Sequence, residues 1–142
     1  MPTKSGLIAA LVAACGVLTA MPALALPVIP GASGFGIETP AGRGGTVYRV
    51  TNLNAAGQGS LQACVSAYGP RVCVFETSGT IRLTGDLVIR NPNITIAGQT
   101  APSPGITIRG AGLQIWASDV LVQHLRIRPG DDADGPPPDN RD

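Results

Sequence analysis

The chain has 142 residues, the size of one ordinary domain, and a formal net charge of +1. Hydrophobic residues make up 44 %, which argues against global disorder, and Lys and Glu are too scarce for a coiled coil or helical bundle. Glycine (19) and proline (13) are abundant, so many tight turns are expected. A charge this close to zero gives no reason to expect nucleic-acid binding.

Residues 1–25 have the pattern of a secretory signal peptide. Lys4 supplies a positive start, residues 7–18 are mostly apolar, and Ala23–Ala25 forms an A-x-A cleavage site. We therefore expect a secreted protein, extracellular or periplasmic, with no membrane segment after cleavage. Val12–Cys15 also resembles a lipoprotein box, but the residues after it stay apolar, which favours the signal peptide.

The remaining chain keeps two cysteines, Cys64 and Cys73, nine positions apart. In an exported chain, two cysteines at this spacing can form a local disulfide. Two buried thiols are the alternative. The oxidising compartment favours the disulfide.

Residues 26–70 form a Gly-rich segment with one predicted strand, Thr46–Val50, and one predicted helix, Ser60–Tyr68. Ser60 is a suitable N-cap, and Gly69-Pro70 should end the helix. Apolar residues recur at i, i+3, i+4 and i+7, which predicts one buried face. These residues are Leu61, Cys64, Val65 and Tyr68.

Residues 71–129 change to short β-branched runs separated by Gly, Pro, Asn and Asp. The predicted strands are Val72–Glu76, Thr80–Leu83, Leu87–Ile89, Ile94–Ile96, Ile106–Arg109, Leu113–Trp116 and Val120–Arg128. Residues 130–142 form an acidic loop rich in Pro and Gly.

Three of these segments repeat at nearly one offset. Thr80–Arg82 matches Thr107–Arg109 27 positions later, and Leu87–Ile89 and Asn93–Ile96 match Leu113–Ile115 and Asp119–Val122 26 positions later. Such a period predicts a solenoid, here an all-β parallel β-helix whose coils cover one another. An antiparallel sandwich is the alternative, but it does not predict equal offsets. The short helix would cover the open end of the first coil, tied down by the disulfide.

Several motifs in combination resemble the N-terminal part of bacterial pectate-lyase-like proteins. The resemblance covers residues 30–142. The motifs are Pro30–Gly36 (PGASGFG), Val50–Asn54 (VTNLN), Gly59–Ala63 (GSLQA), Val74–Ile81 (VFETSGTI), Ile94–Pro102 (ITIAGQTAP) and Leu125–Asp131 (LRIRPGD).

This resemblance implies a right-handed parallel β-helix with a capping α-helix. It also implies a secreted lyase, monomeric when complete, that cleaves pectate (polygalacturonate) by Ca²⁺-assisted β-elimination. Members of the family are usually much longer, and the family's catalytic Arg would lie beyond residue 142. We therefore expect an incomplete member that is inactive by itself.

Candidate ligands for Ca²⁺ lie in the acidic loop, because carboxylate oxygens are its preferred ligands. By resemblance, Asp142 matches the first residue of the family's acidic strand, whereas Asp131 and Asp132 are weaker candidates. A solvated acidic loop is the alternative interpretation. One Asp cannot supply the roughly 6–8 oxygens that Ca²⁺ needs.

Candidate substrate-binding residues are His124, Arg126 and Arg128, which alternation places on one face of the predicted strand Val120–Arg128. Arg82 and Arg109 occupy equivalent repeat positions and should line up outside the coil. Arginine suits recognition of carboxylates, so these residues could hold an acidic polysaccharide. Solvation or pairing with the acidic loop is the alternative. A non-catalytic β-solenoid, either a surface adhesin or a carbohydrate-binding module, is the second functional hypothesis.

Overall fold

The computed structural model describes residues 36 and 38–130. The expected signal peptide, the lipoprotein interpretation of Cys15 and the acidic residues from Asp131 onward lie outside the described residues. No helix in the described part of the chain is long and apolar enough to cross a membrane.

Short strands are the main regular elements of the described chain. Its elements are β1 (Thr46–Val50), α1 (Leu61–Ser66), β2 (Arg71–Phe75), β3 (Gly79–Arg82), β4 (Leu87–Ile89), β5 (Ile94–Ala97), the 3₁₀ helix η1 (Gly98–Thr100), β6 (Ile106–Arg109), β7 (Leu113–Ile115), β8 (Val120–Gln123) and β9 (Leu125–Arg128). All the predicted strands are present. The last predicted strand is divided into β8 and β9.

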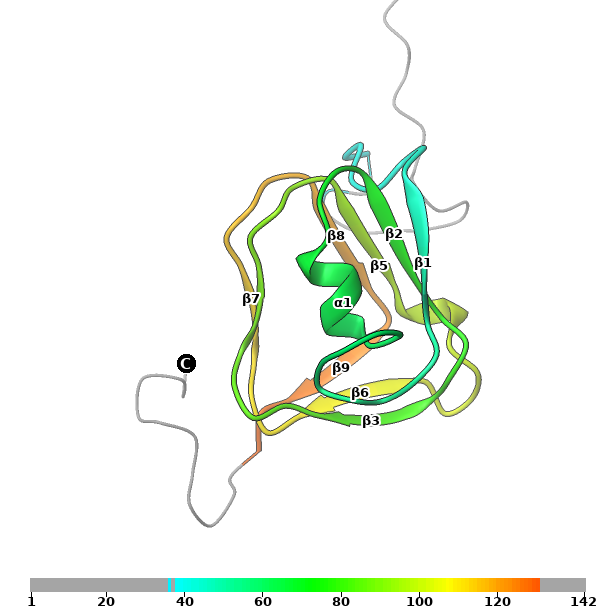
Figure 1. Cartoon of the computed structure of the whole chain (residues 1–142), viewed down its shortest axis with the longest axis vertical. Helices are drawn as coiled ribbons and strands as arrows, with labels where there is room; N and C mark the ends of the chain where they lie inside the picture. The colour runs from blue at the N-terminus through cyan, green and yellow to red at the C-terminus, as the bar shows by residue number, and fades with distance from the viewer. Residues whose placement is uncertain (1–35, 37, 131–142) are drawn as a thin grey trace, which may run out of the picture.

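The strands form three parallel sheets, consistent with a parallel β-helix (Figure 1). Sheet A has the order β1-β2-β5-β8, sheet B has β3-β6-β9, and sheet C has β4-β7. In Figure 1 sheet A lies on the right, sheet B along the bottom and β7 of sheet C on the left, around one interior. The antiparallel sandwich is thereby excluded for the described residues.

The strand register confirms the repeat. Ile81 pairs with Ile108, Leu87 with Leu113, and Ile94 with Val120. These pairs are 27, 26 and 26 positions apart. The step is not constant elsewhere, because the turns differ in length: Arg71 pairs with Ile94, and Ile106 pairs with Leu125.

The interior is filled by side chains that point inward from all three sheets. Ile89, Ile96, Ile106 and Ile108 have no exposed surface. Burial on this scale is the main stabilising contribution, on the order of 2 kcal/mol for each large aliphatic side chain. In the last described coil the cover is thinner, so Ile127 is 41 % exposed.

The segment before β1 covers part of the outside of sheet A, at β2 and β5. The Gly42 amide donates to Thr95 Oγ1 at 3.0 Å, and Thr95 is fully buried. A Cβ at Gly42 would lie 2.0 Å from the carbonyl oxygen of Arg71, so only glycine allows this close approach. Both faces of β5 are consequently buried.

Helix α1 covers the end of the first coil but is shorter than predicted. Ser60 is confirmed as the N-cap, since its Oγ accepts a hydrogen bond from the Ala63 amide at 3.3 Å. Leu61, Cys64 and Val65 are buried as expected. The prediction for Tyr68 was wrong: the helix ends at Ser66, Ala67 is extended, and Tyr68 is 86 % exposed.

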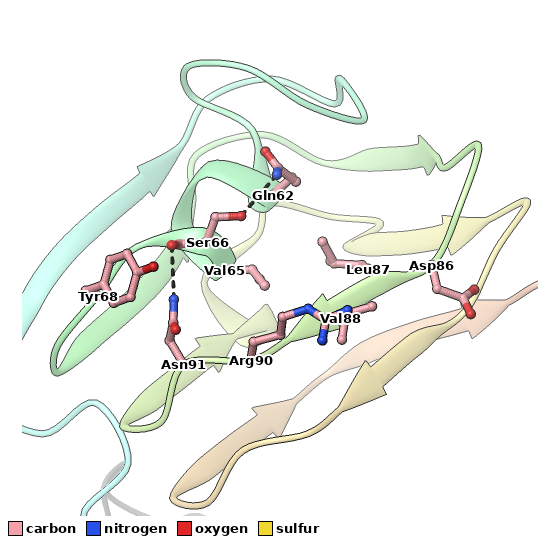
Figure 2. Close-up of a pocket in the computed structure, with 9 residues that line it drawn as sticks. All are labelled: Gln62, Val65, Ser66, Tyr68, Asp86, Leu87, Val88, Arg90 and Asn91. Atoms are coloured by element: carbon pink, nitrogen blue, oxygen red, sulfur yellow. Dashed lines mark hydrogen bonds between the residues drawn. The ribbon is translucent and has the colours of Figure 1, made fainter.

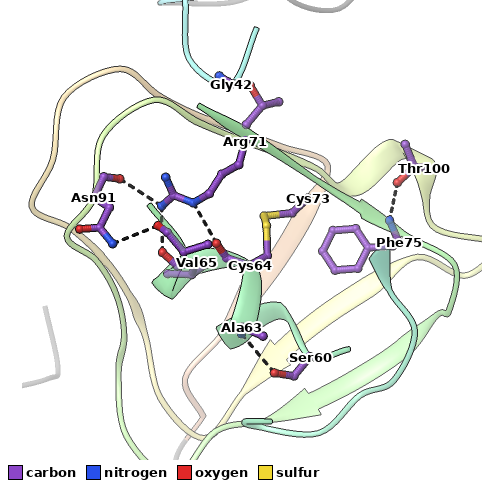
Figure 3. Close-up of a disulfide and its surroundings, with 12 residues drawn as sticks. Gly42, Ser60, Ala63, Cys64, Val65, Arg71, Cys73, Phe75, Asn91 and Thr100 are labelled. Atoms are coloured by element: carbon purple, nitrogen blue, oxygen red, sulfur yellow. Dashed lines mark hydrogen bonds between the residues drawn. A yellow bond between two sulfur atoms is a disulfide. The ribbon is translucent and has the colours of Figure 1, made fainter. Parts of the chain in front are cut away.

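Arg71 binds the last carbonyls of helix α1. Its guanidinium is fully buried and donates to carbonyl oxygens of Cys64 (2.9 Å) and Val65 (2.8 Å), at the helix C-terminus (Figure 3). It also donates to carbonyls in two turns, and these belong to Gly69, Asn91 and Pro92. Burial lowers the pKa of Arg71, and the nearby Tyr48 raises it. The five carbonyl oxygens take the place of the water that the Arg71 guanidinium loses on burial.

The predicted disulfide between Cys64 and Cys73 is confirmed. It joins α1 to the middle of β2, and both cysteines are almost completely buried (Figure 3). Arg71 and the disulfide thus fix the helix to the same strand, two residues apart.

We predict that removing the disulfide lowers the free energy of unfolding by about 2–3 kcal/mol, because the closed loop is short. The double substitution Cys64→Ala and Cys73→Ala should lower Tm in a thermal melt, and dithiothreitol should lower the Tm of the unsubstituted protein similarly. Equal melting temperatures with and without dithiothreitol would contradict this.

We predict that Arg71→Met costs about 3 kcal/mol or more, because the substitution removes five hydrogen bonds that a buried side chain makes. Chemical denaturation would measure the loss. The exposed Arg43 serves as the matched control, and Arg43→Met should change stability by less than about 0.5 kcal/mol. Similar losses in the two variants would refute the importance of the buried guanidinium.

Candidate functional site

The outer surface of sheet B carries the arginines that the repeat predicts. Arg82 pairs with Arg109, and Arg109 with Arg128, so the three residues form a column across β3, β6 and β9. All three are exposed. The expectation that Arg82 and Arg109 line up outside the coil is therefore confirmed, and Arg128 extends the line.

A second outward column contains Thr80, Thr107 and Arg126. The Arg126 guanidinium donates a hydrogen bond to the Pro104 carbonyl. Arg126 is exposed and on the same strand as Arg128, but it is turned toward a neighbouring loop. The threonines show that the fold accepts small uncharged residues on this face.

His124 does not share a strand with the two arginines. The predicted strand Val120–Arg128 bends at His124, where φ is 54°, and the chain passes from sheet A to sheet B. The bend packs on the previous coil so tightly that a Cβ at Gly98 would lie 2.5 Å from the His124 carbonyl oxygen. The alternation of inward residues is broken here, because Val120 and Val122 are followed by Leu125, and this break was the signal in the sequence that could have revealed the bend.

Cations outnumber carboxylates in the described residues, with eight arginines and four acids. Glu76 pairs with Arg49 at 2.7 Å, on a different face. Asp86 accepts from the Gly112 amide, and Asp119 accepts from a threonine hydroxyl. Glu38 is the fourth acid. Three of the four described carboxylates are therefore engaged elsewhere than with the arginine column.

A groove of about 340 Å³ lies between α1 and β4 (Figure 2). Polar groups line much of it, including Gln62, Asp86 and Arg90. Asn91 closes one end by donating to the Ser66 carbonyl at 3.1 Å. No sequence pattern indicates this groove, because its two walls, α1 and β4, are separate in the sequence.

Arg90 also lies over the ring of Trp116, with 4.1 Å between its guanidinium carbon and the ring centroid. The two residues follow β4 and β7 and are 26 positions apart, so the repeat offset could have predicted their contact. Trp116 is 62 % exposed. Its packing is therefore against a cation on the surface and not within the core.

The described residues contain no group of three or more His, Cys, Asp or Glu side chains that could hold a metal ion. The Asp86 carboxylate, for example, is held by the Gly112 amide at 2.7 Å and the Gln114 amide at 2.5 Å. The candidate ligands Asp131, Asp132 and Asp142 lie outside the described residues, so their predicted function stays a prediction.

Comparison with known proteins agrees with the motifs. No protein-family model matches the chain. Proteins named probable pectate lyase C from Aspergillus oryzae and Aspergillus fumigatus are 47 % identical over 107 residues, and one from Emericella nidulans is 46 % identical. The chain is similar to part of these proteins. Each match covers 75 % of this chain but only 25 % of the relative, so the chain spans about a quarter of the curated relatives' length.

We predict that Arg90→Ala exposes Trp116, the only tryptophan of this pectate-lyase-like chain. The variant should show stronger acrylamide quenching of fluorescence and a loss of about 0.5–1 kcal/mol in unfolding free energy, because an exposed cation–π contact contributes that much. Arg43→Ala is the control. Unchanged quenching in Arg90→Ala would show that the guanidinium does not cover the ring.

Proposed function

We propose that this chain supplies the first coils of a secreted pectate lyase that cleaves polygalacturonate by Ca²⁺-dependent β-elimination. The 47 % identity with pectate lyase C over 107 residues carries the proposal. The three parallel sheets support a right-handed parallel β-helix, since parallel strand crossovers are almost always right-handed. The Cys64–Cys73 disulfide supports an oxidising, extracytoplasmic location.

The proposed reaction breaks a bond between two uronate units without water. A base removes the proton on C5, the electron pair forms a C4–C5 double bond, and the C4–oxygen bond to the neighbouring sugar breaks. The leaving oxygen then takes a proton. A bound Ca²⁺ would neutralise the uronate carboxylate and so make the C5 proton more acidic.

The described residues do not by themselves fit a calcium ion, so no step of the reaction is assigned to them. The calcium proposal depends on Asp142, with Asp131 and Asp132 as weaker candidates, together with ligands from a longer protein. The base is expected beyond residue 142. A chain of this length is therefore proposed to be inactive, and the longer protein to act as a monomer.

The proposed contribution of the described residues is to hold the polymer. Arg126 and Arg128 are exposed on β9, and His124 is exposed at the bend that precedes it. Guanidinium groups bind carboxylates through paired hydrogen bonds, and a polyuronate has one carboxylate on each unit. These side chains would orient the polymer and would not take part in proton transfer.

We predict that a protein extended to the length of its relatives produces unsaturated uronates from polygalacturonate, measured by their ultraviolet absorbance. EDTA should abolish the increase, and added Ca²⁺ should restore it. Asp142→Ala should lower the rate roughly tenfold or more, because even outer-shell partners of a bound metal have effects of that size. Glu38→Ala is the matched control. Absence of product from the extended protein would overturn the proposed activity.

The second hypothesis, a non-catalytic surface or carbohydrate-binding solenoid, is favoured by the column of arginines on sheet B, because binding requires no base or metal. The same assay separates the hypotheses. An extended protein that binds polygalacturonate but forms no unsaturated product would support the second.

A further inference from the structure

We infer that the outer surface of sheet B is a binding track for a linear polyuronate, with Arg82 and Arg128 as its two terminal contacts. The inference rests on the proposed function for the class of polymer. It adds a binding surface that is separate from the acidic residues proposed to hold calcium, and it requires no catalysis.

The arginines on the outside of sheet B form a regular column. Arg82, Arg109 and Arg128 lie in register on adjacent parallel strands, so one cation recurs in each coil. Adjacent strands are roughly 4.8 Å apart, which places the backbones of Arg82 and Arg128 roughly 10 Å apart. A straight row of evenly spaced cations fits a polymer that carries one anion on each unit.

Like charges directly opposite each other on neighbouring strands destabilise a sheet. The neighbouring column has Thr80 and Thr107 at the same coil positions, so the fold itself does not require charge here. Of the described carboxylates, Glu76, Asp86 and Asp119 are held by other groups. Arg109 already has a partner within the protein, so an external polyanion would compensate the charges of Arg82 and Arg128.

The outer surface of sheet B is open. Gly42 covers β2 and β5 on the outer face of sheet A, whereas Arg82 and Arg128 remain exposed on sheet B. Sheet B lies along one complete side of the coil in Figure 1. Arg109, between them, already interacts with another group of the protein, and the proposal does not require its guanidinium to be available.

The outward residues of sheet B also favour a polysaccharide over a single-stranded nucleic acid. They are Thr80, Arg82, Thr107, Arg109, Arg126 and Arg128. Proteins that bind single strands without sequence preference combine cations with aromatic side chains on which bases stack. No aromatic residue is present among these six, so the surface offers charge without a stacking platform.

The test measures binding of fluorescently labelled oligogalacturonate to the 142-residue chain by anisotropy at low ionic strength. Arg82→Gln and Arg128→Gln should each weaken binding about threefold, and the double variant about tenfold, as expected for exposed ion pairs. Added salt should weaken binding, and less steeply in the double variant. The control Arg43→Gln/Arg49→Gln removes the same charge from other faces and should change affinity less than twofold.

Equal losses in the two double variants would overturn the track, because affinity would then follow net charge alone. Undiminished binding in Arg82→Gln/Arg128→Gln would also overturn it. A fully methyl-esterified oligomer should not bind, whichever variants fold, and its binding with equal affinity would refute carboxylate recognition. Binding of an oligothymidylate as tight as that of the uronate would assign the surface to nucleic acid instead. Failure of the extended protein to cleave pectate would remove the proposed function and leave these binding results standing.

Discussion

The buried guanidinium of Arg71 is the interaction on which the start of the coil stack depends. A charge without exposed surface is costly unless hydrogen bonds replace its hydration. Here five carbonyl oxygens do so, from the C-terminus of α1 and from two turns. The Cys64 carbonyl also accepts a hydrogen bond from the Ala67 amide, so Arg71 adds a second donor at the end of the helix. One side chain therefore fixes the end of the helix, the entry into β2 and the turn of the next coil.

Once the first coil is closed, each later coil can stack on it in register. This stacking turns a local feature of the sequence into a surface feature. Ile81 and Ile108 meet inside sheet B, while Arg82 and Arg109 meet outside it. The same parallel register that fills the core with isoleucine therefore also assembles the arginine column. A change of register by one residue would exchange the two faces.

Much of the fold could be predicted because it follows from local patterns. The offset of 26–27 positions identified equivalent strands, and the apolar positions Leu61, Cys64 and Val65 identified the buried face of the helix. The failures occurred where side-chain contacts and packing between coils decided the outcome. The helix ends before Tyr68, where Arg71 donates hydrogen bonds to its last carbonyls. The chain bends at His124, where the next coil packs against Gly98.

The sequence by itself determined the repeat, the strand positions, the disulfide partners and the resemblance to pectate-lyase-like proteins, since each depends on residue identity and spacing. Only the tertiary structure decided which side chains share a surface. The groove beside Arg90 and the line from Arg82 to Arg128 exist because separate coils are brought together. Turns of different length change the step between coils, so contacts between coils depend on how each turn folds and packs.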